Sequence, residues 1–201
     1  LGALTANTPK SMIPVAGRPF IIHKYTRLLP QGYQDFYLSM GYLGEVLVGE
    51  VEHWVRGMTT YLRDGDTPAG TGGALRRAAD FIGGPFLWMY GDAYLPTDYQ
   101  VIEREFVNSL KPALLAVYEN NGQWDTSNIV MEDGEIKDYD KDRPSIFARH
   151  IDYGMGGLTP AAFNGCPPDV PLDLGAVFRR LIREKRLAAF EVKERFYEIG
   201  S

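Results

Sequence analysis

The stretch from Thr8 to Phe20 reads T-P-K-S-M-I-P-V-A-G-R-P-F, and it sets a single cation, Lys10, between two prolines. Proline fixes φ at about −65° and lacks a backbone N–H, so Pro9 and Pro14 favour a stiff, extended path over a helix. Pro19 suits the first position of a helix that follows. A lysine on a rigid loop near a helix start is well placed to aim one positive charge at a phosphate, although a plain surface lysine fits the same letters.

Outward from this stretch, short apolar runs alternate with segments of helical periodicity. The run from Phe86 to Tyr90 is compact, apolar and ended by Gly91-Asp92, which is typical of a strand in the middle of a sheet. Residues 129–131 and 136–139 flank an Asp-Gly pair and predict a hairpin. Helices are predicted over residues 19–29, 43–55, 73–81, 99–110 and 174–184, and further strands over 36–40, 60–62, 113–118, 151–158 and 187–192. This order predicts an α/β protein with a mixed, mostly parallel central sheet flanked by helices, and with a small hairpin or second sheet.

The composition narrows the class of protein. A length of 201 residues suits one domain, spanning residues 1–201. The net charge of −5 argues against general nucleic-acid binding, and no stretch approaches the length of a membrane span. A single cysteine, Cys166, fits a reducing compartment, so a cytoplasmic location is expected. An acidic protein that handles phosphates must concentrate its cations locally or recruit a metal.

Two loops carry residue types suited to a nucleotide. Asp64 to Gly73 reads D-G-D-T-P-A-G-T-G-G, where glycines allow close backbone approach and exposed N–H groups suited to a nucleobase edge. This pattern matches neither the P-loop nor the dinucleotide fingerprint, and an ordinary glycine-rich turn explains it equally well. Asp92 follows the central apolar run, where a carboxylate is well placed to hold Mg²⁺. An aspartate that caps the following turn is the alternative.

The sugar side is marked less sharply. Thr126-Ser127-Asn128 supplies hydroxyl and amide groups suited to sugar hydroxyls. For Asn128 and Asp152, a structural place at a hairpin or strand end is about as expected as a ligand contact. The three histidines, at positions 23, 53 and 150, share no metal-ligand spacing.

Several of these runs resemble one family. Sugar-phosphate nucleotidylyltransferases carry Pro-Lys-x-Met-x-Pro-Val-x-Gly-x-Pro near the N-terminus, and this chain matches it at Pro9, Lys10, Met12, Pro14, Val15, Gly17 and Pro19. G-T-G-G-A-L resembles the family's nucleobase loop, Gly-Asp its metal site, and Y-E-I-G-S its late Asp-Ile-Gly motif, with glutamate in place of aspartate. The resemblance implies a Rossmann-like nucleotide-diphospho-sugar transferase fold. It also implies a glycine-rich loop and a first strand upstream of Leu1.

The resemblance assigns a role to each candidate residue. The implied catalytic residues are Lys10, Asp92 and Lys141, and the implied Mg²⁺ ligands are Asp92 and Glu198. The implied nucleotide-binding residues are Gly70, Thr71, Gly72, Gly73 and Gly91, and the implied sugar-binding residues are Asn128, Asp152 and Gly154. The longer side chain of Glu198 puts the geometry of the metal site, rather than its existence, in question.

The implied reaction joins a sugar 1-phosphate to a nucleoside triphosphate and releases pyrophosphate, with Mg²⁺ as cofactor, in nucleotide-sugar synthesis for cell-envelope polysaccharides. GTP with a heptose or mannose-like 1-phosphate is the expected pair, and a uridylyltransferase for N-acetylmuramic acid 1-phosphate is the main alternative. A glycosyltransferase on the same fold and a non-catalytic nucleotide-sugar sensor are the alternatives from other classes. Neither a nucleic acid nor a membrane is an expected partner, and homo-oligomer formation is left open.

Overall fold

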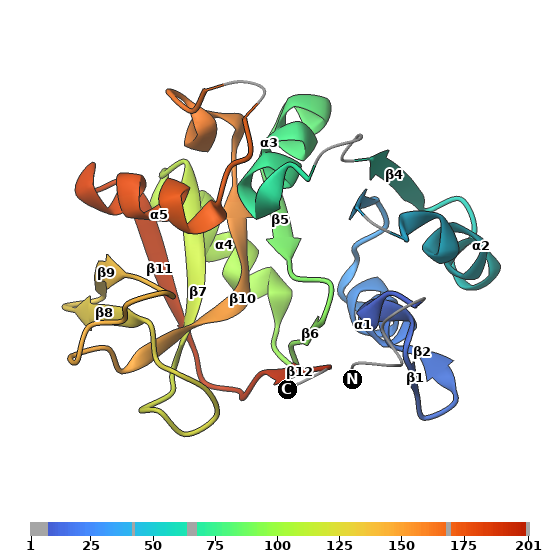
Figure 1. The fold of residues 1–201 in the computed structure, drawn as a ribbon, viewed down its shortest axis with the longest axis horizontal. Helices are drawn as coiled ribbons and strands as arrows, with labels where there is room; N and C mark the ends of the chain where they lie inside the picture. The colour runs from blue at the N-terminus through green and yellow to red at the C-terminus, as the bar shows by residue number, and fades with distance from the viewer. Residues whose placement is uncertain (1–7, 42, 64–67, 168–169, 200–201) are drawn as a thin grey trace. The chain divides into compact units, whose positions relative to one another are not determined.

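The computed structural model describes residues 8–41, 43–63, 68–167 and 170–199. The chain forms two compact units, which Figure 1 shows together. The first unit is assembled from three separate segments, residues 1–68, 90–96 and 196–201. The second unit comprises residues 69–89 and 97–195. The single-domain organisation expected from the chain length stays a prediction.

The described residues of the first unit form two α-helices, two short 3₁₀ segments and three small two-stranded sheets. Strands β3 and β4 pair in parallel, whereas β1–β2 and β6–β12 are antiparallel pairs. The elements are η2 (Lys10–Met12), β1 (Pro14–Val15), β2 (Arg18–Pro19), α1 (Phe20–Leu28), η3 (Leu29–Gln31), β3 (Phe36–Met40), α2 (Gly44–Trp54), β4 (Thr59–Arg63), β6 (Ala93–Tyr94) and β12 (Tyr197–Glu198).

The core of the first unit is built around helix α1. Its apolar side chains pack with Met12 of η2 and with Val51 and Val55 from α2 and its C-terminal end. Tyr25 of α1 lies edge-on to Phe36 of β3, with ring centroids 4.7 Å apart. The η2 segment therefore rests on a buried methionine, which fixes the backbone that carries Lys10.

The second unit is built on a six-stranded mixed sheet. Five of the strands follow the order β11-β7-β10-β8-β9. The sixth, β5, pairs with β10. Strand β10 runs antiparallel to β5, β7 and β8, while β11 runs parallel to β7, so β5, β7 and β11 share one direction. The strands are β5 (Phe86–Met89), β7 (Ala113–Glu119), β8 (Ile129–Glu132), β9 (Glu135–Tyr139), β10 (His150–Leu158) and β11 (Leu187–Val192).

Helices cover both faces of this sheet. The helical elements of the unit are α3 (Gly70–Ile82), α4 (Tyr99–Ser109), η4 (Pro160–Phe163) and α5 (Leu174–Arg183). Phe178 of α5 packs on one face, with its ring centroid 6.0 Å from that of Trp88 in β5. Helix α4 covers the other face (Figure 1), where its Phe106 lies over β10. This arrangement buries nearly all of β10.

Two adjacent glycines allow this close packing. A Cβ atom at Gly156 would lie 2.1 Å from the carbonyl oxygen of Leu114, and one at Gly157 would lie 2.3 Å from the ring of Phe106. Real Cβ atoms do not approach other atoms so closely, so the G-G pair in β10 is required by the packing of β7 on one side and α4 on the other.

The α/β class, the mixed sheet and the hairpin are confirmed. Strands 36–40 and 187–192 have the predicted bounds. Two local predictions were wrong. The segment after Pro9 is a short 3₁₀ turn instead of an extended path, and helix α3 begins at Gly70 instead of Gly73. Among the described residues, no helix is long and apolar enough to cross a membrane.

Candidate active site

Asp92 lies in the turn that links β5 to β6, as predicted from the apolar run before it. Its carboxylate oxygen Oδ2 is 3.6 Å from Nζ of Lys10, and both side chains are partly exposed. Gly91 precedes it, and a Cβ atom at that position would meet no other atom. The structure therefore brings together the lysine of the proline-rich stretch and the carboxylate of the Gly-Asp pair, which are far apart in the sequence.

Glu198 is placed beside Asp92 by a strand pair that the sequence did not predict. In the antiparallel β6–β12 pair, Glu198 lies opposite Ala93. One position further along, the backbone N–H of Ile199 donates a hydrogen bond of 2.9 Å to the carbonyl oxygen of Asp92. Glu198 thus lies in β12, and Asp92 lies in the turn immediately before β6, one position out of register with it. Gly200 and Ser201 of the Y-E-I-G-S run lie outside the described residues.

A buried lysine, Lys24 of α1, adjoins this pair and was missed by the sequence analysis. Its ammonium donates a hydrogen bond to the carbonyl oxygen of Tyr90, two residues before Asp92. Burial lowers the pKa of Lys24 to about 8, and the negative charge of Asp92 only partly opposes this shift. A lysine in a helix usually faces solvent, so the sequence held no signal for its burial. Asp92 therefore has two cations near it, the exposed Lys10 and the buried Lys24.

The lowered pKa of Lys24 makes a specific prediction about stability. Between pH 8 and 10 the unfolded chain keeps this proton while the folded chain loses it, so stability rises with pH. Relative to Lys24→Met, we expect the wild type to gain about 2 to 3 kcal/mol of unfolding free energy between pH 7 and pH 10. Urea unfolding of both proteins at several pH values measures the difference between their unfolding free energies. Titrating groups that the two proteins share cancel in this difference. A difference that does not change with pH would contradict the burial of this charge.

The glycine run lies at the first turn of helix α3. The backbone N–H groups of Gly72 and Gly73 donate hydrogen bonds to the carbonyl oxygen of Leu172, at 2.8 and 3.1 Å. A Cβ atom at Gly70 would lie 2.6 Å from that same oxygen. The glycines thus allow a close backbone approach, as predicted, but the approaching segment is Leu172. Its carbonyl oxygen accepts hydrogen bonds from two of the amides that were expected to contact a nucleobase. The Thr71 hydroxyl accepts a hydrogen bond from the Leu174 N–H, at 3.3 Å. Residues 64–67 of this loop lie outside the described residues.

In the second unit, Asp152 and Lys141 form an ion pair. Nζ of Lys141 is 2.9 Å from Oδ2 of Asp152, whose side chain is only 2% exposed. The Tyr139 hydroxyl donates to the same oxygen at 3.1 Å, and the Gly154 N–H donates to Oδ1 at 2.8 Å. A buried carboxylate must be paired and hydrogen-bonded, and these donors meet that need. Asp152, predicted as a sugar ligand, therefore holds Lys141, whose side chain is 45% exposed.

The other predicted sugar residues surround Asp152. Asn128 is buried, and its Oδ1 accepts a hydrogen bond of 3.1 Å from the Asp152 N–H. Gly154 has a φ of 86° and lies where the register of β10 against β7 shifts, between Asp152 and Gly156. Four predicted residues, from β10 and from the segments next to β8 and β9, thus form one hydrogen-bonded cluster: Asn128, Lys141, Asp152 and Gly154.

The first unit contains two carboxylates of the kind that bind hard divalent cations. Among residues 8–41, 43–63, 68–167 and 170–199, no group of three or more acidic, histidine or cysteine side chains could hold a metal ion. Mg²⁺, however, is commonly bound by one or two carboxylates together with substrate phosphates and water. Asp92, in the turn before β6, and Glu198, in β12, supply two carboxylates whose backbones lie close together, which are the residue types that this pattern needs.

Two curated relatives extend over most of the chain. It is 24% identical over 172 residues to UTP–glucose-1-phosphate uridylyltransferase AglF of Haloferax volcanii, covering 83% of this chain and 70% of the relative. It is 21% identical over 211 residues to the mannose-1-phosphate guanylyltransferase catalytic subunit beta of Xenopus tropicalis, covering 100% of this chain and 58% of the relative. No protein-family profile matches the chain.

The fold resembles that of a solved bacterial protein. The crystal structure of HddC from Yersinia pseudotuberculosis matches with a TM-score of 0.79 at 23% identity, over 100% of this chain and 88% of that one. The structure of the same protein complexed with GMP-PN matches with a TM-score of 0.77. These likenesses confirm the predicted fold. Together with the sequence relatives, they confirm the predicted resemblance to sugar-phosphate nucleotidylyltransferases.

Proposed function

We propose that this chain, which resembles sugar-1-phosphate nucleotidylyltransferases in sequence and fold, joins a sugar 1-phosphate to a nucleoside triphosphate and releases pyrophosphate. The observation that carries the proposal is the pairing of Lys10 with Asp92 in the turn after β5, with Glu198 on the neighbouring strand. This cluster combines a cation for phosphate oxygens with two carboxylates for a divalent metal. The proposed reaction needs no protein nucleophile, because an oxygen of the sugar phosphate itself attacks.

The chemistry is an in-line displacement at phosphorus. An oxygen of the sugar phosphate, largely dianionic near pH 7, attacks the α-phosphorus of the triphosphate. The bond from that phosphorus to the α–β bridging oxygen breaks, and pyrophosphate leaves with the electron pair. Asp92 and Glu198 would hold Mg²⁺, which neutralises phosphate charge when bound. Lys10 stabilises the negative charge that builds up on the α-phosphate oxygens.

The Asp152 cluster is proposed to bind the sugar phosphate. Lys141 offers a partly exposed ammonium, and its ion pair with the buried Asp152 restricts where that ammonium lies. A positioned charge costs no reorganisation when the substrate binds. Lys141 is thus the proposed phosphate contact, and Asp152 is the residue that positions it.

We expect GTP to be the preferred nucleotide, with a heptose or mannose-like 1-phosphate as the second substrate. The support is the G-T-G-G-A-L run and the likeness to HddC, whose structure was solved with GMP-PN. Guanine presents both donors and acceptors, so a matched site rejects other bases by leaving buried polar groups unpaired. The likeness to a uridylyltransferase keeps UTP as the competitor.

Pyrophosphate release from a mixed panel of triphosphates and sugar 1-phosphates tests both the activity and the nucleotide. The expected result is release that needs Mg²⁺ and is fastest with GTP. Faster release with UTP would overturn the nucleotide preference and favour N-acetylmuramic acid 1-phosphate as the sugar. Nucleotide-sugar binding without pyrophosphate release would instead identify a non-catalytic sensor. Transfer of sugar from a nucleotide sugar to an acceptor would identify a glycosyltransferase.

A further inference from the structure

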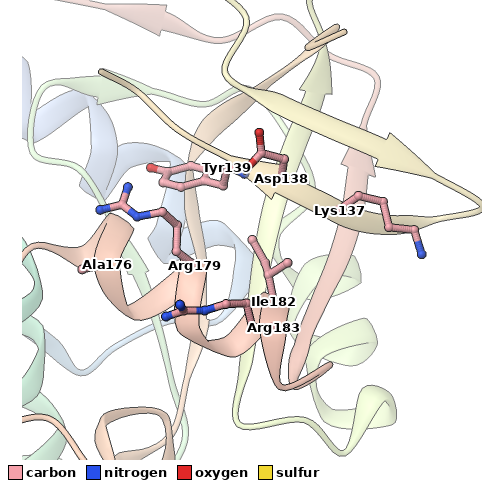
Figure 2. A pocket seen from close by; sticks show the side chains of 7 residues that line it. All are labelled: Lys137, Asp138, Tyr139, Ala176, Arg179, Ile182 and Arg183. Atoms are coloured by element: carbon pink, nitrogen blue, oxygen red, sulfur yellow. The ribbon is translucent and has the colours of Figure 1, made fainter. Parts of the chain in front are cut away.

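A cavity of about 290 Å³ lies between helix α5 and strand β9 in the second unit (Figure 2). Its walls come from two elements of different character. Helix α5 provides a mixed apolar and cationic wall, and β9 provides the opposite one. The lining residues are Lys137, Asp138, Tyr139, Ala176, Arg179, Ile182 and Arg183.

The cavity concentrates positive charge in an acidic protein. Three of its lining side chains are cationic and one is acidic, whereas the whole chain has a net charge of −5. Arg179 and Arg183 are four residues apart on α5 and therefore share one face of the helix. Figure 2 shows both guanidinium groups extending to the left, whereas the Lys137 side chain extends to the right, away from them.

The three cations differ in how their charge is already used. Nζ of Lys137 is 2.6 Å from Oε2 of Glu135, so this charge is paired. Arg179 has a looser contact of 3.5 Å with Oδ2 of Asp173. The side chain of Arg183 makes no hydrogen bond or ion pair with any residue in the described part of the chain. The charge of Arg183, with part of that of Arg179, is therefore available to a ligand.

We propose that this cavity binds a small organic phosphate monoester, with its phosphate on Arg183 and Arg179. Planar guanidinium groups bind phosphate oxygens through paired, charge-assisted hydrogen bonds. Ile182, which is partly exposed, provides apolar surface for the organic part. The volume lies at the lower end of small-molecule sites, which span about 300 to 1,000 Å³. A protein partner would need a contact of about 800 Å², far more than seven residues offer.

Occupancy of this cavity has a direct route to the Asp152 cluster. Tyr139 forms one wall, and its hydroxyl donates to the carboxylate that also holds Lys141. Helix α5 packs tightly here, because a Cβ atom at Gly175 would lie 3.0 Å from the Tyr139 ring. The Tyr139 side chain is buried, so a ligand acts on it through the cavity wall around it, and through its hydroxyl on Asp152, which positions Lys141. Whether a ligand here changes sugar-phosphate binding depends on the role proposed above for Lys141.

Nuclear magnetic resonance titration of the whole chain with phenyl phosphate and with inorganic phosphate tests the site. We expect amide shifts in α5 and β9, with tighter binding of phenyl phosphate. Arg183→Gln should weaken this binding at least about tenfold, because a charge-assisted contact is lost. Arg104→Gln, an exposed arginine on α4, is the matched control and should bind as the wild type does. If wild type and Arg183→Gln bound phenyl phosphate equally well, the proposed site would be wrong. If phenyl phosphate and inorganic phosphate bound equally well, the proposed contact with the organic group would be wrong.

The link to Asp152 has its own readout, which needs no enzyme activity. Phenyl phosphate should shift the amide resonance of Gly154, whose N–H donates to Asp152. Tyr139→Phe should keep the binding, because the ring remains, but should lose this distant shift. A Gly154 resonance unmoved at saturation in the wild type would overturn the link while leaving the site itself supported. Failure of the pyrophosphate assay alone would affect neither result.

Discussion

Replacing Asp92 with asparagine should lower turnover by at least about a thousandfold and leave the fold intact. An amide oxygen is a poorer ligand than a carboxylate for a hard cation, so the stabilisation of phosphate charge is lost. A loss of that size corresponds to about 4 kcal/mol of barrier. The fold should survive because the side chain is 38% exposed, and its pair with Lys10 is a surface pair worth about 0 to 1 kcal/mol. Turnover and melting temperature measured on the same samples separate the two effects.

Asp98→Asn is a matched control for this substitution. Asp98 caps helix α4 by accepting the Gln100 N–H, and asparagine caps as well as aspartate does. We therefore expect wild-type turnover. Glu198→Gln should resemble Asp92→Asn, and Glu198→Asp should retain part of the activity. If Asp92→Asn turned over within tenfold of the wild type, Asp92 would not belong to the site.

Lys10→Ala should damage catalysis far more than stability. Its backbone is held by the 3₁₀ turn and by the buried Met12, while its side chain is 51% exposed. Removing such a side chain should change the unfolding free energy by less than about 0.5 kcal/mol. Its charge stabilises the phosphate oxygens, so turnover should fall by about a hundredfold to a thousandfold. Steady-state kinetics with GTP and chemical unfolding measure the two quantities.

The comparison for this variant is Lys193→Ala. Lys193 is also exposed and also paired with a carboxylate, that of Glu191. If the loss of any ion-paired lysine lowered turnover, Lys10→Ala and Lys193→Ala would lower it equally. We expect only Lys10→Ala to lose turnover. A fall in melting temperature at unchanged turnover would show that Lys10 has a structural role instead.

Local rules were sufficient for much of the fold. The Asp133-Gly134 pair predicted a tight hairpin, and both residues have positive φ, 51° and 76°, as a type I′ turn requires. Asp92 was placed at the end of a strand because compact apolar runs bounded by turn residues are strands, although β5 pairs only with β10 and so lies at the edge of the described sheet, not in its middle. These features depend on neighbours in the sequence, so the sequence alone could reveal them.

Features that depend on distant partners could not be predicted. The β6–β12 pair has two residues in each strand, too short for any periodicity to show. The burial of Lys24 depends on the Tyr90 carbonyl, which only the folded chain brings near. The amides of Gly72 and Gly73 were expected to face a ligand, but the Leu172 carbonyl takes them. In each case the deciding contact lies far away in the chain.

The three-segment construction of the first unit has a consequence for protein synthesis. Asp92 leaves the ribosome about 100 residues before Glu198, its neighbour across the β6–β12 pair. At about 5 to 20 residues per second, this delay lasts roughly 5 to 20 seconds. Throughout that time the nascent chain carries Lys10 and Asp92 without the strand that completes their surroundings. The proposed metal site therefore forms only after residues 196–199 have emerged, so a shorter nascent chain lacks its proposed second carboxylate.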